Sequence, residues 1–368
     1  MSRPRFGSLE AASRWFADWL AGAALPLWAD AGVEAASGAF QERLTLRGEP
    51  VPGPRRARVQ ARQAFVYARA AQASFAGPWL AAAERGFSAY LARYRRPDGL
   101  FAMAVDEAGR VIDDTPFLYE QAFSLLAMAG LTAAGAQPRQ AEAERLLGAL
   151  QGHRHPAGGF RELDDHPFQS NAHMHLLESV LAWDELGAGP AWTALADEIV
   201  GLARAKFIDP EGGFLREFFD ADWRPAAGDD GRWVEPGHQF EWAWLLERWG
   251  RTRGDAGARA AARTLFGHGL AGVDRARGVA VNVLWDDLSV RDAAARLWPQ
   301  TEYLKAAVIL GEAAEALAAA NGLARYLDVP TPGVWRDRLQ PDDRFVDEPA
   351  PASSFYHIEL AVLELLGR

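Results

Sequence analysis

The sequence predicts an all-α fold, an (α/α)6 barrel in which twelve helices form a six-fold double ring, spanning residues 1–368 as a single domain. Three observations lead to this expectation. A short turn motif recurs six times along the chain, and helix-patterned segments alternate between amphipathic and apolar. Strand patterns are confined to short loop segments such as residues 278–284, and no Pro- or Gly-rich linker divides the chain.

The repeated motif is a glycine followed closely by an apolar or aromatic residue. Glycine accepts positive φ and can therefore end a helix in a tight turn. The six copies lie roughly 55 to 65 residues apart, a longer period than that of common helical solenoids. They are Gly38-Ala39-Phe40, Gly99-Leu100-Phe101, Gly158-Gly159-Phe160, Gly212-Gly213-Phe214, Gly278-Val279 and Gly333-Val334-Trp335.

An amphipathic helix precedes each turn and a more apolar helix follows it. Residues 79–94 show the amphipathic pattern, and residues 141–150 and 192–207 occupy the same place in later units. Apolar helices belong in an inner ring and amphipathic helices in an outer ring that covers it. The inner helices are expected to begin near Val59, Pro116, Asn171, Pro236, Trp298 and Ser353.

Composition excludes several classes of function. The net charge is −10 and no basic run occurs, which argues against nucleic-acid binding. The chain has no cysteine, so disulfides and thiol chemistry are excluded. Arg14 and Asp18 interrupt the first apolar stretch, and the longest uncharged stretch, residues 123–137, is too short to span a bilayer. We therefore expect a soluble, cytoplasmic protein without membrane contact, in which that stretch forms a buried helix.

Equivalent units place the starts of all six inner helices at one end of the barrel. The residues capable of catalysis or of hydrogen bonding to a ligand lie near these starts. Although they are spread over most of the sequence, they should converge on one mouth of the barrel. They are Arg62, Tyr119, Asn171, His175, His238, Glu241, Trp242, Trp298, Glu302 and His357.

Each histidine also has an ordinary structural interpretation. His173 and His175 are two residues apart on a helix, so they face different ways and only one should face the lumen. His175 is preferred because it heads an apolar stripe. His238 follows Glu235-Pro236-Gly237, a helix start whose free amides should depress its pKa, and Glu241 one turn later could orient its ring. Helix capping alone is the alternative for that stretch.

Arg62 and His357 complete the candidate catalytic set. Arg62 lies within an apolar helix and cannot lose its charge, so it should face a cavity, an acidic partner or a substrate oxygen. His357 follows Ser353 and Ser354, either of which can cap the last helix. Phosphate loops, dinucleotide fingerprints, zinc-protease motifs and calcium loops are all missing from the sequence. The sequence therefore predicts no cofactor and no metal.

Five motifs in order along nearly the entire chain resemble the N-acylglucosamine 2-epimerase superfamily. The resemblance implies an (α/α)6 barrel, in agreement with the six units counted from the turns. It also implies an active site of Arg62, His175, His238, Glu241 and His357. The motifs are residues 59–63 (VQARQ), 171–178 (NAHMHLLE), 235–246 (EPGHQFEWAWLL), 298–302 (WPQTE) and 351–358 (PASSFYHI).

Asn-x-x-Met-His at residues 171–175 looks like the mannose isomerase, sulfoquinovose isomerase and cellobiose epimerase branches of the superfamily. The closing Ser-Ser-Phe-Tyr-His at residues 353–357 looks like the mannose isomerase branch. The resemblance implies interconversion of D-mannose and D-fructose through an enediol, by metal-free acid–base catalysis. A 2-epimerase acting on mannose and glucose, on N-acylglucosamine or on cellobiose is the alternative.

In this interpretation His357 is the base at C2, and His238, oriented by Glu241, opens the ring and acts as the partner acid. Arg62 holds the oxygens on C1 and C2, and His175 binds a hydroxyl. The expected sugar contacts are Tyr119, Asn171, Trp242, Trp298 and Glu302.

Other functions stay open at this stage. A glycosidase would need two carboxylates across a cleft, for which Glu241 and Glu302 are available, and a non-catalytic sugar-binding protein is a third possibility. The expected substrate is a monosaccharide, and Arg55, Arg56 and Arg58 near the mouth are candidates to bind a phosphate on it. The sequence does not distinguish a monomer from a homodimer.

Overall fold

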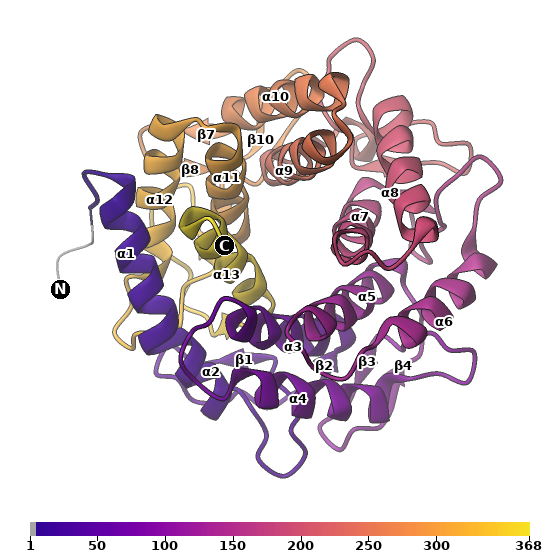
Figure 1. Ribbon diagram of the computed structural model, residues 1–368. Coiled ribbons are helices and arrows are strands. Elements are labelled where there is room, and N and C mark those ends of the chain that lie inside the picture. Colours follow the sequence, from indigo (N-terminus) through magenta and orange to yellow (C-terminus); the bar gives the residue numbers. More distant parts are fainter. Residues whose placement is uncertain (1–4) are drawn as a thin grey trace.

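The computed structural model describes residues 5–368, and its helices form two concentric rings (Figure 1). The inner ring consists of α3 (Ala57–Gln72), α5 (Leu118–Ala133), α7 (Ser170–Glu185), α9 (Pro236–Arg253), α11 (Leu297–Leu310) and α13 (Ser353–Leu366). The outer ring consists of α1 (Leu9–Trp19), α2 (Leu25–Asp30), α4 (Trp79–Tyr94), α6 (Gln140–Leu150), α8 (Pro190–Leu202), α10 (Ala256–Ala271) and α12 (Ala313–Leu327). Helix α13 packs against both α11 and α3, which closes the inner ring.

The predicted fold class is confirmed. Each inner helix begins within two residues of its expected start, and α4 has the bounds read from the sequence. The uncharged stretch from residue 123 lies mainly in α5, nearly all of whose side chains are buried. The apolar pattern succeeds because the inner helices are covered on almost every side. Among residues 5–368, no helix combines the length and apolarity needed to cross a bilayer.

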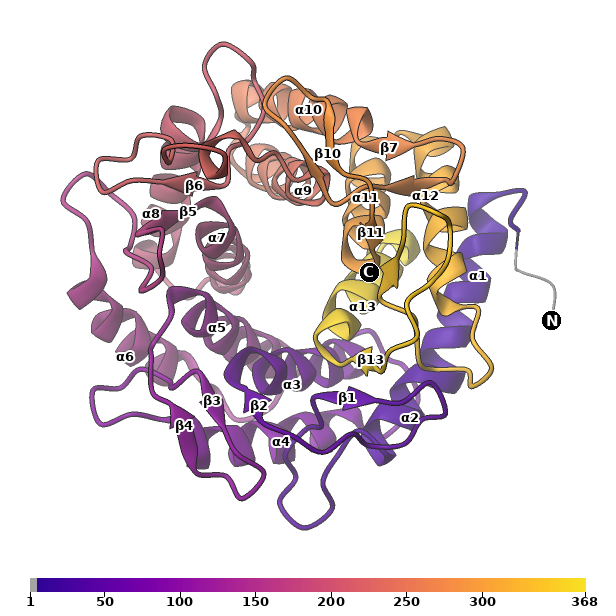
Figure 2. The same ribbon diagram turned by 180° about the vertical axis from the view of Figure 1, so that it is seen from behind.

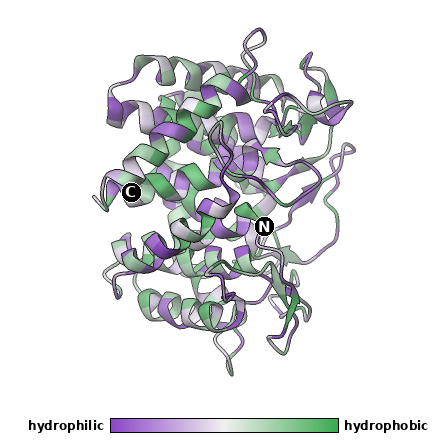
Figure 3. Ribbon diagram, turned by 90° about the vertical axis from the view of Figure 1, so that its right-hand side faces the viewer, coloured by the Kyte–Doolittle hydropathy of each residue, from purple (hydrophilic) through white to green (hydrophobic). Residues whose placement is uncertain are grey.

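Short antiparallel strands join neighbouring loops at one end of the barrel. They pair as β1 (Arg43–Leu44) with β13 (Ala350–Pro351), β2 (Arg55–Arg56) with β3 (Ala104–Val105) and β4 (Val111–Asp113), β5 (Phe168–Gln169) with β6 (Phe218–Phe219), β7 (Val273–Asp274) with β8 (Val279–Ala280), β9 (Val283–Leu284) with β10 (Val290–Asp292), and β11 (Ala295–Arg296) with β12 (Arg338–Leu339). Seen from behind and from the side, the strands and long loops gather at this end, where the inner helices start (Figures 2 and 3).

The glycine turns are fastened to the inner helices by one recurring side-chain contact. A glycine in each turn has positive φ, which confirms why glycine is used there. In four units the fourth residue of the following inner helix is a glutamine whose amide binds both the N–H and the C=O of one turn residue. These pairs are Gln60 with Phe40, Gln121 with Phe101, Gln239 with Leu215, and Gln300 with Ala280.

His173 takes the same place in the third unit. Its Nε2 accepts from the N–H of Phe160 and its Nδ1 bonds to the carbonyl of Gln169. This confirms that His173 is a structural residue facing away from the lumen. Because buried peptide groups are costly when left without partners, these contacts fix where each inner helix starts relative to its loop.

Gln60→Ala is expected to destabilise the fold without touching the cavity. It would leave the buried N–H and C=O of Phe40 without partners, each costing about 1–3 kcal/mol, so the free energy of unfolding should fall by roughly 2–6 kcal/mol. Urea denaturation followed by circular dichroism measures the change. Gln151→Ala, at an exposed position, is the control. Equal stability of the two variants would show that the contact is dispensable.

Candidate active site

A cavity of about 480 Å³ opens at the loop-rich end of the barrel, where the inner helices begin. Eight of the ten predicted site residues line it, although they come from all six inner helices. They are Arg62, Tyr119, Asn171, His175, His238, Glu241, Trp298 and His357. The loops add Trp233, Glu235 and Arg291 to the rim.

The residues at the floor of this cavity occupy the same position, counted from the start, in their inner helices. Arg62, His175 and Glu241 are each the sixth residue of their inner helix, and Phe123 and Glu302 hold the same position in α5 and α11. Helices that start at the same level and run in the same direction bring equally numbered positions to the same depth. The expected convergence of distant residues on one mouth follows from this register.

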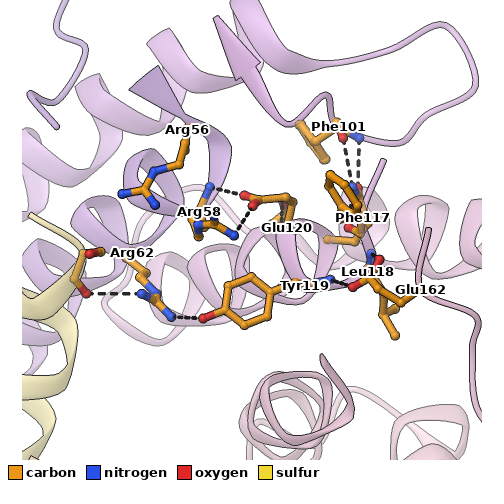
Figure 4. Close-up of polar contacts among 12 residues, drawn as sticks. Arg56, Arg58, Arg62, Phe101, Phe117, Leu118, Tyr119, Glu120 and Glu162 are labelled. Carbon is orange, nitrogen blue, oxygen red and sulfur yellow. Dashed lines mark hydrogen bonds and ion pairs between the residues drawn. The ribbon is translucent and has the colours of Figure 1, made fainter. Parts of the chain in front are cut away.

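Arg62 is a buried guanidinium without a carboxylate partner. It donates to the hydroxyl of Tyr119 at 2.7 Å and to the carbonyl of Ser353 at 3.2 Å (Figure 4). Its Cζ atom lies 3.9 Å from the centre of the Phe123 ring, and its Nε has no partner. In contrast, neighbouring Arg58 is paired with buried Glu120. The charge of Arg62 is therefore available to an oxyanion in the cavity.

His238 is held by a carboxylate from a loop. Its Nδ1 lies 2.7 Å from Glu217 Oε2 and 3.7 Å from Glu235 Oε2. Burial by itself would lower the pKa of His238, but Glu217 and Glu235 outweigh it and raise the pKa to about 10. His238 is therefore protonated at neutral pH. The expected depression of its pKa was wrong, because two carboxylates outweigh the helix terminus.

His357 has the opposite protonation state. Burial, reinforced by the positive charges of Arg62 and Lys305, holds its pKa well below the usual value, so the ring is neutral. Its Nδ1 lies 2.8 Å from Glu302 Oε1. Trp298 lies beside both histidines, its ring centre 5.0 Å from that of His238 and 5.9 Å from that of His357. The cavity thus holds a charged and a neutral imidazole next to the same indole.

His175 and Glu241 provide two further polar groups. Burial lowers the pKa of His175 to about 3, and its Nδ1 lies 3.7 Å from a carboxylate oxygen of Glu178 and from one of Glu241. Burial, and then the charge of Glu302, raise the pKa of Glu241 well above its usual value. Both oxygens of Glu241 are buried without a hydrogen-bond partner. A neutral carboxyl that lines a cavity can donate a hydrogen bond to a ligand oxygen.

Two predicted sugar contacts do not line the cavity. Trp242 is fully buried, with its ring 5.7 Å from that of Phe207, because one residue after Glu241 turns the side chain about 100° away from the lumen. Glu302 is also fully buried, and instead of facing a sugar it lies within hydrogen-bond distance of Nδ1 of His357.

Sequence reasoning also assigned the wrong partner to His238. The carboxylate that orients it is Glu217, and Glu241 lies beside His175 instead. Glu217 sits just before β6 and 21 residues before His238, in a loop without periodicity. The only available signal was its place shortly after the fourth glycine turn, Gly212-Gly213-Phe214.

Three groups of side chains have the spacing that metal coordination requires: His175 with Glu178 and Glu241, Glu217 with Glu235 and His238, and Glu241 with Glu302 and His357. In the second group, the donor nitrogen of His238 already carries a proton bonded to Glu217. Arg62 and Lys305 place positive charge next to the other two. Their chemistry suits proton transfer better than the binding of a divalent cation.

Comparison with known proteins gives the family. The model of the N-acylglucosamine 2-epimerase family matches residues 38–361. The chain belongs to this family. A relative from Rhizobium meliloti (strain 1021), named mannose-6-phosphate isomerase, is 47% identical over 369 residues and covers 95% of each chain. The protein is therefore a sugar isomerase or epimerase. The resemblance noted in the sequence is confirmed.

Solved structures agree with the fold. A D-mannose isomerase superposes with a TM-score of 0.88 at 20% identity, covering 100% of both chains. The cellobiose 2-epimerase of Spirochaeta thermophila DSM 6192 superposes with a TM-score of 0.86 at 22% identity, covering 98% of this chain and 96% of the other. Isomerases and epimerases of the family thus share this barrel.

Glu217→Gln is expected to lower the pKa of His238. Since Glu217 raises that pKa, its loss lets His238 lose its proton at a lower pH, and the alkaline limb of the kcat/KM profile should move to lower pH by at least about one unit. Histidine NMR titration and the pH–rate profile measure the change. Asp230→Asn, which removes the carboxylate beside His166 on the surface, is the control and should leave the profile unchanged. An unshifted alkaline limb in Glu217→Gln would contradict the assignment.

Proposed function

We propose that this protein interconverts D-mannose and D-fructose, with neutral His357 as the base at C2 and protonated His238 as the acid. The observation that carries the proposal is the pair of imidazoles beside Trp298, whose surroundings push their pKa values in opposite directions. Opposed protonation of two groups in one cavity is what proton transfer by an acid and a base requires.

The reaction begins with ring opening, in which His238 gives a proton to the ring oxygen and then takes the proton of the hydroxyl on C1. His357 removes the proton on C2 while His238 protonates the aldehyde oxygen, which gives an enediol between C1 and C2. Return of the proton from His357 to C1, with transfer of the hydroxyl proton on C2 to His238, yields the ketose and restores both histidines. All protons balance, and no redox partner is needed.

Arg62 stabilises the negative charge that develops on the oxygens of C1 and C2. Its guanidinium has no carboxylate to neutralise it, and the residue itself is buried. Fixed donors in such surroundings stabilise an oxyanion more strongly than water does. In this proposal His175 and Glu241 bind hydroxyl groups, and Tyr119, Asn171 and Trp298 hold the rest of the sugar.

The reaction is proposed to be metal-free, because Arg62 and the charged His238 supply the electrophilic groups. Epimerisation at C2 is the competing outcome, in which the proton returns to the opposite face of C2. A glycosidase mechanism with the carboxylate pair Glu241 and Glu302 is disfavoured, since Glu302 does not line the cavity and is bonded to His357 instead.

Turnover of mannose in heavy water is expected to give fructose with deuterium on C1. The extent of labelling equals the fraction of turnovers in which the proton on His357 exchanges with solvent before it reaches C1. NMR of the products measures the position of the label. Deuterium only at C2, with glucose as product, would instead establish epimerisation.

His357→Ala should lower kcat by about 10²–10⁴-fold while circular dichroism stays unchanged. The assay is run after treatment with a chelator, and activity that needs added divalent metal would contradict a metal-free mechanism.

A phosphorylated sugar is a second candidate substrate, and Arg291 is the residue that favours it. Its guanidinium lies 4.3 Å from the ring of Trp233 and 4.9 Å from that of Trp285, and it lines the outer part of the cavity. Among residues 5–368, no carboxylate forms an ion pair with it. The name of the Rhizobium relative points to the same kind of substrate.

Comparison of mannose with mannose 6-phosphate tests this second candidate. If Arg291 binds the phosphate, Arg291→Gln should lower kcat/KM for mannose 6-phosphate by about 10–100-fold, as expected for loss of a charged hydrogen bond, and leave that for mannose within about two-fold. Arg344→Gln, at an exposed position away from the cavity, is the control. Equal losses for both sugars, or no turnover of the phosphate, would remove the second candidate.

A further inference from the structure

A layer of side chains below the active-site cavity contains one lysine. Lys305, Glu178 and Trp244 are each the ninth residue of their inner helix, about one turn deeper than the sixth-position residues. Glu178 and Trp244 also line a second cavity of about 380 Å³, which is bordered by residues near the opposite ends of the inner helices, such as Arg69 and Arg248. This layer therefore forms a partition across the barrel.

Lys305 is fully buried in this partition and faces the catalytic machinery. Its Nζ lies 2.6 Å from Glu302 Oε2 and 4.1 Å from the centre of the Trp244 ring. The other oxygen of Glu302 is 2.8 Å from Nδ1 of His357. The contacts form a line from the ammonium through the carboxylate to the proposed base.

The choice of lysine stands out against the composition. Lys206 and Lys305 are the only lysines among 39 basic residues, and every other basic residue is an arginine. A compact ammonium can occupy a closed space that a planar guanidinium with five donors would not fit. A lysine at a fully buried position of an arginine-rich chain indicates that a point charge is needed there.

Three buried carboxyl groups from three helices surround this single cation. Glu302 lies on the same helix, Glu241 comes from α9 and Glu178 from α7, while His175 and Arg62 face the same region from α7 and α3. Burial raises the pKa of Glu302, and the ammonium of Lys305 opposes this rise. Burial would lower the pKa of Lys305, but the carboxylates raise it, so the lysine stays charged.

We propose that Lys305 is a positioning residue that keeps Glu302 ionised, so that Glu302 accepts the Nδ1–H of His357 and leaves the Nε2 lone pair free for the substrate. The inference rests on the proposed role of His357 as the base. An ionised carboxylate can only accept a hydrogen bond, which fixes the tautomer of a neutral imidazole. A protonated Glu302 would donate to Nδ1 instead, move the ring proton to Nε2 and remove the base.

Lys305→Met tests the proposal because methionine keeps the length of the side chain without its charge. Without the ammonium, the pKa of Glu302 rises, so the acidic limb of the kcat/KM profile should move to higher pH by at least about one unit, with recovery as the pH increases. A merely structural role would lower activity at all pH values without moving the limb, and would overturn the proposal. Lys206→Met, which changes the other lysine, is the control and should leave the profile unchanged.

A second set of measurements, on the wild-type protein and on Glu302→Gln, needs neither turnover nor a mutation of Lys305. With ¹⁵N-lysine labelling the protein contains only two Nζ signals, one from Lys206 and one from Lys305. In Glu302→Gln the pKa of Lys305 should fall by at least about one unit, with that of Lys206 unchanged. ¹⁵N-histidine spectra of the wild type should show the proton of His357 on Nδ1. A proton on Nε2 of His357, or a pKa of Lys305 that does not respond to Glu302→Gln, would overturn the proposal. Because these spectra report protonation alone, they stay decisive even if the sugar reaction proves to be epimerisation.

Discussion

The common start of the six inner helices is the constraint on which the site depends. A side chain at the fourth position of five of these helices binds a backbone group of the preceding glycine turn and thereby sets the height of the helix. The sixth position then reaches the floor of the cavity in α3, α7 and α9. A helix shifted by one residue would turn Arg62, His175 or Glu241 by about 100°, away from the lumen. The hydrogen bonds that hold the glycine turns to the inner helices thus also align the cavity side chains with one another.

Burial and the neighbouring charges together set the protonation states of His238 and His357. His238 has two carboxylates near its Nδ1, and their charge overcomes the cost of burying an imidazolium. His357 has one carboxylate beside its Nδ1, that of Glu302, and this carboxylate is itself paired with Lys305. His357 is also close to the positive charge of Arg62. The extra positive charge leaves burial as the dominant influence on His357. Two imidazoles in one cavity therefore differ because of the groups behind them.

The fold was predictable from the sequence because its signals are local. Helical periodicity and glycine turns depend on residues that are near in sequence. Both recur six times, so a weak pattern in one unit can be identified from the same pattern in the others. The cavity residues were largely predictable because they sit at helix starts. Trp242 was misassigned because a linear motif does not give the angle at which a side chain leaves its helix, and Glu302 was misassigned because its contact with His357 arises only in the tertiary fold. Glu217 was missed because it lies in a loop, where contacts with His238 arise only from the tertiary fold.

The partition below the cavity explains how several carboxyl groups can coexist in a closed space. One ammonium cannot neutralise three carboxylates, and ionising all of them without water would be very costly. The pKa of Glu178 falls to about 2, because nearby His175, the charge of Lys305 and the hydrogen bond from Tyr356 outweigh its burial, so this group is ionised. The pKa of Glu241 rises well above its usual value, so this group stays neutral. The protein thus places its neutral carboxyl in the wall of the cavity, whereas Glu302 and Glu178 do not line that cavity. A sugar oxygen that develops negative charge beside Glu241 then meets a hydrogen-bond donor and the charge of Arg62, and not a second negative charge.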